Sequence, residues 1–389
     1  MPVKNRFAEM LPEITGWRHD FHRHPELLYE VHRTAAKVAE LLRSFGVDEV
    51  TEGIGRTGVV GVIRGRSDLS GRVVGLRADM DALPIHETTG LDYASGQPGV
   101  MHACGHDGHT AMLLGAAKYL AETRNFDGTA VVIFQPAEEG GGGGLAMIED
   151  GLTDRWRIDE YYGMHNMPGL PVGAFAIKPG AIMASTDQFD ITVTGRGGHA
   201  AKPNEGIDTT LVAAQIIVAL QSVVSRNVDP LKSGVVSVCV VETDSRAHNV
   251  IPDVVRMKGT SRSLDAGVRD QLEDGVRRVA EGVAAAYGAQ VEIDYDRGYP
   301  VTLNHPDATI HAAEAAREIA GAVDLDVAPL MAGEDFSYML ESRPGAYIFI
   351  GNGDSGMLHT AGYNFDDGAI PAGSSWYARM VETRLPVAG

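Results

Sequence analysis

The stretch TAVVIFQPAEE, residues 129–139, decides the fold class of this 389-residue chain. Its nearly continuous apolar run is typical of a strand buried on both faces, and similar runs stand at RVVGLRADM (72–80) and GVVGVIRG (58–65). A helical stretch, Thr110 to Arg124, lies between residues 72–80 and 129–139. Strand, helix and strand in this order predict an α/β domain with a mostly parallel sheet.

Helical spacing of apolar residues predicts a helix over 30–45 in the opening segment and another over 304–320, and a glycine follows each. The run AYIFIGNG (346–353) predicts one more buried strand. These elements extend the same domain on both sides of a central segment.

The pattern changes near residue 186. The order β-α-β-β-α-β that follows is the ferredoxin-like unit. We therefore predict a small domain of residues 186–297, inserted into a larger domain made of residues 1–185 and 298–389. Its strands are expected over 187–195, 233–242, 253–263 and 289–296, and its helices over 206–226 and 264–287.

The chain carries 33 Lys and Arg against 52 Asp and Glu, a formal net charge of −19. Nucleic acids and anionic membranes attract basic surfaces, so this charge disfavours both as partners. The N-terminal segment MPVKNRFAEMLPEITGWRHD lacks the apolar core of a signal peptide, and no run of about 18 apolar residues predicts a membrane span.

Only two cysteines occur, Cys104 and Cys239, and they are far apart in the sequence. This usage fits a reducing compartment, and we expect a cytoplasmic protein. Cys239 falls within a predicted strand and is expected to be a small core residue.

The stretch MHACGHDGH (101–109) places three histidines, one cysteine and one aspartate in nine residues. Imidazole, thiolate and carboxylate are the side chains that bind transition metals. Two more histidines stand in glycine-flanked segments that we expect to be turns, YYGMHNMPG and GMLHTAG. We name as the ligand set Cys104, His106, Glu139, His165 and His359.

Carboxylates stand at the ends of two predicted strands, Asp79 and Asp81 after one and Glu138 and Glu139 after the other. The carboxyl ends of parallel strands meet at one edge of a sheet, so these groups should converge with the His/Cys cluster in one crevice.

The pair Glu138–Glu139 suggests a division of labour, in which one carboxylate binds metal and the other is a general base toward a metal-activated water. A capping pair at a helix start is the alternative. The glycine run 140–144 has no Gly-Lys-Ser/Thr after it, so it predicts close backbone approach or a flexible edge rather than a phosphate cradle.

The chain resembles the hippurate hydrolases and N-acyl-amino-acid amidohydrolases (aminoacylases) among the di-metal peptidases. This branch includes plant auxin-conjugate hydrolases and bacterial N-acetyl-diaminopimelate deacetylases. The resemblance rests on motifs spread over nearly the whole chain: DFHRHPE (20–26), RADMDALP (77–84), MHACGHDGH (101–109), QPAEEG (135–140), GMHN (163–166), GRGGHAAKP (195–203), HNVIPD (248–253), GEDF (333–336) and LHTAGYNF (358–365).

The resemblance implies that the ligand set binds two divalent metal ions, with Mn²⁺ or Zn²⁺ expected and Co²⁺ or Ni²⁺ as alternatives. It assigns Glu139 as the ligand and Glu138 as the general base. Related branches have a His-x-Asp pair where this chain has Asp79 and Asp81, which leaves their roles open. We expect these two, and Glu334 with its neighbour Asp335, to orient the ligands by hydrogen bonds, with a plain structural role as the alternative for the latter two.

The resemblance also implies that residues 186–297 form a lid and dimerisation domain, so that a homodimer or a dimer of dimers is expected. In this family the histidine of the GGHA motif, here His199, reaches into the partner's active site and stabilises the oxyanion. Asn249 and Arg262 match positions that bind the substrate's carboxylate, although an ordinary salt-bridged strand residue is the alternative for Arg262.

The expected reaction is metal-dependent hydrolysis of an N-acyl amino acid to a carboxylate and a free amino acid. A dipeptidase or aminopeptidase acting with the same metal centre is the alternative enzyme. A non-enzymatic protein with a structural zinc site is disfavoured, because such sites are closed and rich in cysteine. A zinc nucleobase deaminase is disfavoured too, because its Pro-Cys-x-x-Cys signature is absent.

Overall fold

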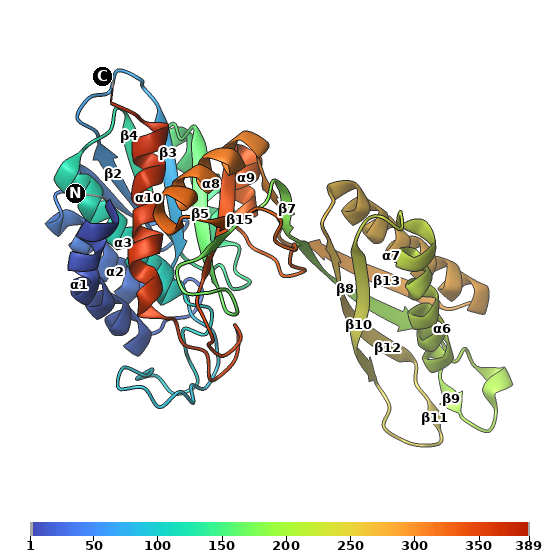
Figure 1. The fold of residues 1–389 in the computed structure, drawn as a ribbon. Coiled ribbons are helices and arrows are strands. Elements are labelled where there is room, and N and C mark those ends of the chain that lie inside the picture. The colour runs from blue at the N-terminus through green and yellow to red at the C-terminus, as the bar shows by residue number, and fades with distance from the viewer. Residues whose placement is uncertain (1–2, 388–389) are drawn as a thin grey trace. The chain divides into compact units, whose positions relative to one another are not determined.

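The computed structural model of the protein describes residues 3–387 and divides them into two units (Figure 1). The first unit contains the described residues up to Ile182, Leu303–Ala328 and the chain from Asp335 onward. The second contains Met183–Thr302 and Pro329–Glu334.

An eight-stranded sheet forms the centre of the first unit, and its middle strands β4, β3, β5 and β16 run parallel to one another, whereas β2 and β6 on either side of them pair antiparallel. Every residue of β3 and of β16 is buried, as the apolar runs predicted. The predicted mostly parallel α/β class is therefore confirmed. In sheet order the strands are β1 (Glu49–Ile54), β2 (Gly58–Arg64), β4 (Thr129–Gln135), β3 (Val73–Asp79), β5 (Glu160–Met167), β16 (Gly345–Gly351), β6 (Phe175–Ala176) and β15 (Val323–Asp324).

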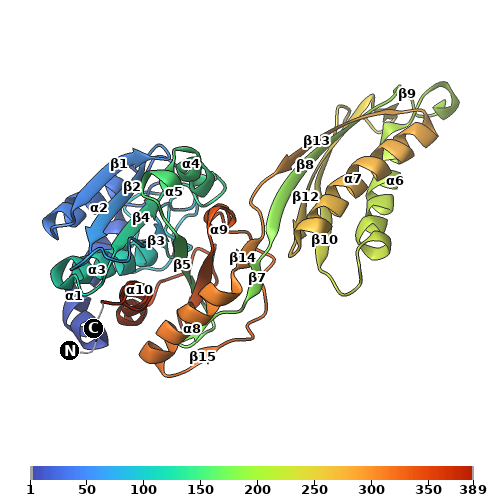
Figure 2. The same ribbon diagram turned by 90° about the horizontal axis from the view of Figure 1, so that it is seen from above.

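Helices cover both faces of this sheet (Figure 2). On one face α1 (Val3–Arg23), α3 (His106–Thr123) and α10 (Ile370–Arg384) pack against one another, and α8 (Pro306–Ala320) packs against α10. The other face carries three short helices, α4 (Gly143–Glu149), α5 (Leu152–Arg155) and α9 (Ser337–Ser342). Helix α2 (His32–Ser44) packs against β1 and β2, and the 3₁₀ turn Asp367–Ala369 leads into α10.

The second unit is a four-stranded antiparallel sheet with two helices on one face (Figure 1). The chain order β-α-β-β-α-β and the sheet order β10-β12-β8-β13 are those of the ferredoxin-like unit, as predicted. Its elements are β8 (Ser185–Thr194), α6 (Thr209–Ser222), β10 (Gly234–Thr243), β12 (Val254–Ser263), α7 (Ala266–Tyr287) and β13 (Gln290–Arg297).

Smaller elements complete the fold. Strand β9 (Gly198–His199) pairs with β11 (Val250–Ile251), and β7 (Gly180–Met183) pairs with β14 (Thr302–Asn304). A 3₁₀ turn spans Pro203–Glu205, and a π-helical turn, Val223–Asn227, extends α6.

The expectation that Cys239 belongs to the core is wrong, because its side chain is exposed. Strand β10 is an edge strand, and its pairing with β12 shifts register between Val238 and Val240. Cys239 falls at this irregularity and is left without a paired residue across the strand.

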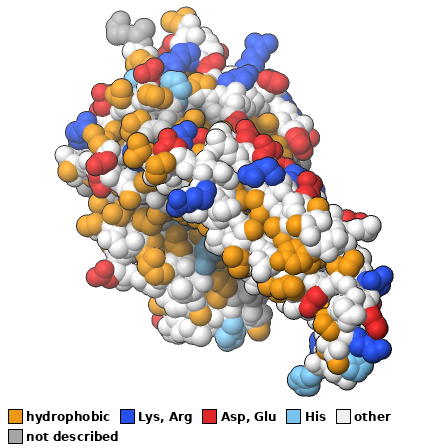
Figure 3. Space-filling view, turned by 90° about the vertical axis from the view of Figure 1, so that its right-hand side faces the viewer, with side chains coloured by type: hydrophobic (Ala, Val, Ile, Leu, Met, Phe, Trp, Pro, Cys, Tyr) orange, Lys and Arg blue, Asp and Glu red, His pale blue; other side chains and the backbone are white. Residues whose placement is uncertain are grey.

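Among residues 3–387, one helical stretch, Thr209–Asn227, has the length and apolar composition to cross a membrane, which differs from the expectation of no such run. The core helix of a soluble protein passes the same test, so this is weak evidence for a span. One third of the stretch is buried, and Leu211 and Val218 are exposed on α6. On the face drawn in Figure 3, hydrophobic side chains gather in patches between acidic and basic ones.

Candidate metal centre

The predicted ligands meet at the carboxyl edge of the parallel strands. Glu139 lies four residues after the end of β4, and His359 lies in the irregular segment that follows β16. Cys104 and His106 stand at the start of α3. His165 lies within β5, so the expectation of a turn at this histidine is wrong; the run EYYGMHNM is a strand buried over all but its last residue.

The ligand atoms form two groups that share Cys104. In one group, Cys104, His106 and His165 have ligand atoms within 4.8 Å of one another, and in the other Cys104, Glu139 and His359 do. The Cys104 Sγ lies 3.4 Å from His165 Nε2, and His359 Nε2 lies 3.3 Å from Glu139 Oε1. The structure thus brings the whole ligand set together.

Gly105, between the two ligands of the HACGHD motif, can only be glycine. Its φ of +86° is left-handed, and a Cβ there would lie 2.3 Å from Asn166 Nδ2 and 2.4 Å from Tyr363 Oη. Asn166 Nδ2 uses this space to donate a hydrogen bond of 2.6 Å to the Cys104 carbonyl. The turn therefore sets Cys104 against β5, where His165 lies.

The donor atoms suit a divalent transition metal. Both ring nitrogens of His106 and the Glu139 Oε1 are buried without a hydrogen-bond partner among residues 3–387, although buried polar atoms normally have one. His165 donates from Nδ1 to the Asn166 carbonyl at 2.7 Å, which leaves the lone pair of Nε2 facing Cys104. Imidazole, thiol and carboxylate around one point are a donor set for such an ion.

Charges within the cluster are strongly coupled. Burial and the nearby Glu139 and Glu138 carboxylates raise the pKa of the Cys104 thiol well above its usual value. Burial alone would lower the pKa of His106, but the Asp79 and Asp81 carboxylates raise it to about 10. The protein's own groups thus favour the thiol and the imidazolium, and a bound divalent cation would favour the thiolate and the neutral imidazole instead.

Glu138 and Glu139 are held by Asp81. Asp81 accepts the backbone N–H of Glu138 at 3.0 Å and that of Glu139 at 3.1 Å, and its Oδ1 lies 3.4 Å from His106 Nδ1. Ala137, just before the pair, has a left-handed φ of +54°, which is uncommon for a residue with a side chain. This backbone places the Glu138 carboxylate, itself buried, within 4.8 Å of both His106 and Glu139 ligand atoms.

Asp79 connects β3 to His109, a histidine outside the predicted ligand set. Its Oδ1 lies 2.6 Å from His109 Nδ1, and its Oδ2 accepts a hydrogen bond of 2.6 Å from Arg77. His109 Nε2 in turn accepts the backbone N–H of Asn166 at 2.9 Å, next to His165. His109 is the last histidine of MHACGHDGH, and its helical spacing from His106 was the signal that could have found it.

Asp335 is buried and joins the segments around the cluster. It accepts hydrogen bonds from Arg77 Nη2 at 3.0 Å, from Gln135 Nε2 at 2.7 Å and from the Gly144 N–H at 2.8 Å. A Cβ at Gly144 would lie 2.7 Å from the Asp335 carbonyl, so the glycine run allows close backbone approach, as predicted. Glu334 is buried, and its carbonyl accepts a hydrogen bond from Thr302 within the second unit.

His199, Asn249 and Arg262 all belong to the second unit. His199 is exposed on β9, and the Ala200 N–H beside it donates to the Asn249 carbonyl at 3.0 Å, so these two lie together. Arg262 stands near the opposite end of β12, about 27 Å from Val254 by strand geometry. One chain therefore does not bring Arg262 together with His199 and Asn249.

Arg262 is half-buried and has no carboxylate within ion-pair distance in the described part of the chain. Its guanidinium donates to the Thr260 hydroxyl and to the carbonyls of Asp187 and Ser261. Burial lowers its pKa. The alternative of an ordinary salt-bridged residue is therefore not what the structure has.

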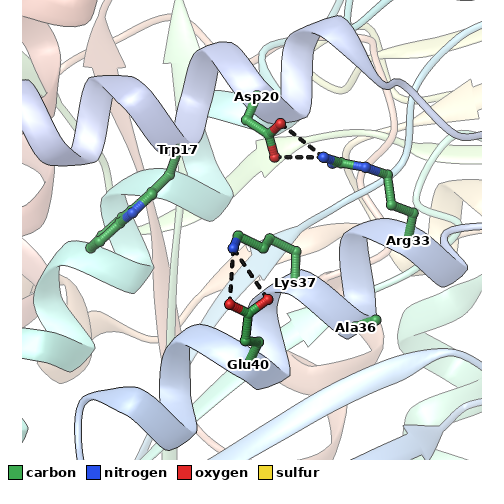
Figure 4. Close-up of a pocket in the computed structure, with 6 residues that line it drawn as sticks. All are labelled: Trp17, Asp20, Arg33, Ala36, Lys37 and Glu40. Carbon is green, nitrogen blue, oxygen red and sulfur yellow. Dashed lines mark hydrogen bonds and ion pairs between the residues drawn. The ribbon is translucent and has the colours of Figure 1, made fainter.

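A surface hollow of about 490 Å³ between α1 and α2 is separate from the ligand set. Its charged side chains are paired with each other, Arg33 with Asp20 at 2.8 Å and Lys37 with Glu40 at 3.1 Å (Figure 4). The residues that line this hollow include none of the predicted ligands.

Known proteins are similar to this chain over most of its length. Residues 75–383 match the family described as peptidase family M20/M25/M40. The chain is 45% identical to the hippurate hydrolase of Campylobacter jejuni over 371 residues, which cover 95% of each chain. It is 41% identical to the N-acetyl-L-cysteine deacetylase of Bacillus subtilis, over 92% of this chain and 85% of that one.

A solved structure is similar over nearly the full length. The Bacillus subtilis YXEP protein, described as a dinuclear metal binding peptidase from the M20 family, superposes with a TM-score of 0.85 at 35% identity, covering 98% of this chain and 100% of that one. Motifs, fold and relatives agree with the resemblance stated from the sequence. The chain belongs to peptidase family M20/M25/M40.

Proposed function

We propose that this protein is a metal-dependent amidohydrolase that cleaves N-acyl amino acids to a carboxylate and a free amino acid. The observation that carries the proposal is the buried ligand set with one further carboxylate, Glu138, beside it. The hippurate hydrolase and deacetylase relatives act on this bond class by name, which supports the same chemistry here.

The ligand set would hold two divalent metal ions, one at Cys104, His106 and His165 and the other at Cys104, Glu139 and His359. We propose Mn²⁺ or Zn²⁺, with Co²⁺ or Ni²⁺ as alternatives. When bound, such ions polarise an amide carbonyl and lower the pKa of a water molecule.

Glu138 is the general base in this proposal. It is buried beside the ligand set, and Asp81 holds its backbone. Its carboxylate takes a proton from the attacking water and delivers it to the nitrogen of the leaving amine, which departs as the free amino acid.

We propose that residues 186–297 form the lid and mediate a homodimer, alone or within a dimer of dimers. The edge strand β10 exposes Val240 and Val241, and α6 exposes Leu211 and Val218. An edge strand with apolar side chains can pair with the same strand of a second copy, which would cover the exposed side chains of both copies.

The two free cysteines fit a cytoplasmic location.

The substrate carboxylate is assigned to Asn249 and Arg262, and the developing oxyanion to His199. Because Arg262 lies near the end of β12 and Asn249 precedes its start, beyond β11, the two must come from different copies if both bind one substrate. Within residues 3–387 the Arg262 guanidinium donates to a hydroxyl and to carbonyls and pairs with no carboxylate, which suits it to recognise an anionic substrate group.

Release of free amine from a panel of N-acetyl and N-benzoyl amino acids tests the function. Chelator-treated protein should be inactive, and Mn²⁺ or Zn²⁺ should restore release. Matched unblocked dipeptides test the peptidase alternative, because a dipeptidase or aminopeptidase requires the free α-amino group. Faster cleavage of the dipeptides would replace the amidohydrolase assignment, and no release from any substrate would contradict both.

A further inference from the structure

The end of α1 carries a buried histidine, His22, with two carboxylate partners. His22 Nδ1 lies 2.9 Å from Asp107 Oδ2, and His22 Nε2 lies 3.3 Å from Glu87 Oε1. The His22 ring is fully buried. A carboxylate oxygen only accepts hydrogen bonds, so both ring nitrogens of His22 carry a proton and the ring is an imidazolium.

The electrostatics agree with this geometry. Burial would lower the pKa of His22, but the Asp107 and Glu87 carboxylates raise it to about 9. Although burial raises the pKa of Glu87, its hydrogen bonds from His22, Thr89 and Ser95 lower it to about 2. The His22 side chain therefore joins two anionic groups at neutral pH.

Through Asp107, His22 is connected to the metal group of Cys104, His106 and His165. Asp107 follows the ligand His106 in the first turn of α3. Arg18 also reaches Asp107 at 3.4 Å, and the helix backbone supports this turn. The His106 side is thus held by several independent contacts.

Through Glu87, His22 is connected to the turn that carries His359. Glu87 organises the irregular loop 86–97 by accepting hydrogen bonds from the Thr89 hydroxyl and the Ser95 N–H. Within that loop, the Thr88 N–H donates to the Ala361 carbonyl at 2.9 Å, and its hydroxyl lies 3.2 Å from the same oxygen. Ala361 is two residues from His359.

The His359 turn needs such support. Residues 352–366 contain no helix or strand, and His359 has a left-handed φ of +61° with a half-exposed side chain. Its own backbone N–H donates to the Ala103 carbonyl at 2.8 Å. A ligand on such a turn binds metal only in the fraction of molecules that hold the competent conformation.

We propose that His22 is a positioning residue for the His359 side of the metal centre, because its imidazolium joins the α3 turn that follows His106 to the Glu87 loop that holds the His359 turn. The inference rests on the proposed ligand set. It assigns to the DFHRHPE motif a role in the affinity of one metal ion.

The test is a calorimetric titration of chelator-stripped protein with Mn²⁺. Wild type should show two sites, and His359→Ala identifies the site to which His359 contributes by abolishing it. In His22→Gln the Kd of that site should rise about tenfold, while the Kd of the other site stays within about twofold. Glu87→Gln breaks the same contact from the loop side and should raise the Kd of the same site about tenfold. If His22→Gln does not fold, this variant replaces it in the test. The double variant should show no larger rise, because both changes break one link.

His24→Gln is the matched control. The His24 ring bonds the Asp20 carbonyl at 2.8 Å and lies 3.5 Å from the Asp20 carboxylate, both one turn back on α1, so both Mn²⁺ sites should keep their affinity. Unchanged Kd values in both His22→Gln and Glu87→Gln, with a lower Tm alone, would overturn the inference, as would equal weakening of both sites. A wild-type chain that binds no Mn²⁺ or Zn²⁺ would overturn the ligand assignment itself, which separates the two failures.

Discussion

His359 Nε2 lies 3.3 Å from Glu139 Oε1, although the two residues belong to turns that follow different strands of the sheet. The contact closes the second metal group, in which Cys104 is the third member. The His359 side chain is half-exposed, so its removal should not disturb the core.

His359→Ala is therefore expected to fold normally and to lose about one metal ion per chain. Elemental analysis after dialysis against a low concentration of Mn²⁺ measures the ratio. His32→Ala, whose side chain is exposed on α2, is the control and should match wild type. An unchanged ratio in His359→Ala would remove this residue from the ligand set.

Glu138→Gln removes the proposed base and leaves the ligand set intact. We expect kcat to fall by about 10²–10⁴ while the metal content stays at the wild-type value. Steady-state hydrolysis of an N-acyl amino acid and elemental analysis of the same sample give both numbers. Glu149→Gln changes an exposed glutamate of α4 and should be fully active; near-normal turnover in Glu138→Gln would refute the base assignment.

Asp81→Asn tests the support beneath the glutamate pair. The two backbone N–H groups bond different carboxylate oxygens, and asparagine replaces one of these oxygens by an NH2 donor, so either Glu138 or Glu139 loses its acceptor. Activity should fall about 10–100-fold, the usual effect of removing a group that orients metal ligands. If kcat and metal affinity both stay at wild-type values, Asp81 has no positioning role.

His22 should make the stability of the metal-free protein depend on pH. Its folded pKa of about 9 is above the ordinary 6.5, so its contribution is complete below pH 6.5 and is lost as the pH rises through 9. The titratable groups that face it keep their charge state across this range: Asp107 and Glu87 stay ionised, and His102, whose pKa burial lowers to about 4, stays neutral. Urea unfolding from pH 6 to 10 should show the free energy of unfolding falling by up to about 1.4 kcal/mol per pH unit relative to His22→Gln. Parallel pH curves for the two proteins would contradict the charged state of His22.

Mixing of two inactive variants tests whether His199 acts across a dimer. His199→Ala and Glu138→Gln homodimers should each be inactive. Heterodimers formed by unfolding and refolding them together contain one intact site, so about a quarter of wild-type activity should return. No recovery, with mixed dimers demonstrated by mass spectrometry, would mean that His199 serves its own chain or has no role.

Local patterns in the sequence predicted most of the elements closely. The run 72–80 became β3 (Val73–Asp79), and the expected helix 264–287 became α7 (Ala266–Tyr287). These predictions succeed because burial leaves a mark in the local order of apolar residues. A strand buried on both faces has a continuous apolar run, and a helix buried on one face has apolar residues at helical spacing. Strand β5 was not predicted, because the glycine and histidine within its sequence are more typical of a turn than of a buried strand.

The sequence by itself determined the chemistry of the centre: which thiol, imidazole and carboxylate groups are available, and that the aspartate and glutamate pairs stand at the ends of strands that share one edge. Only the tertiary structure decided what surrounds them. Asp81 beneath the two glutamates, Asp79 with His109, and His22 between Asp107 and Glu87 are contacts between distant segments. Such contacts depend on how helices and loops pack on the sheet. The periodicity of one segment does not predict which distant segment packs against it.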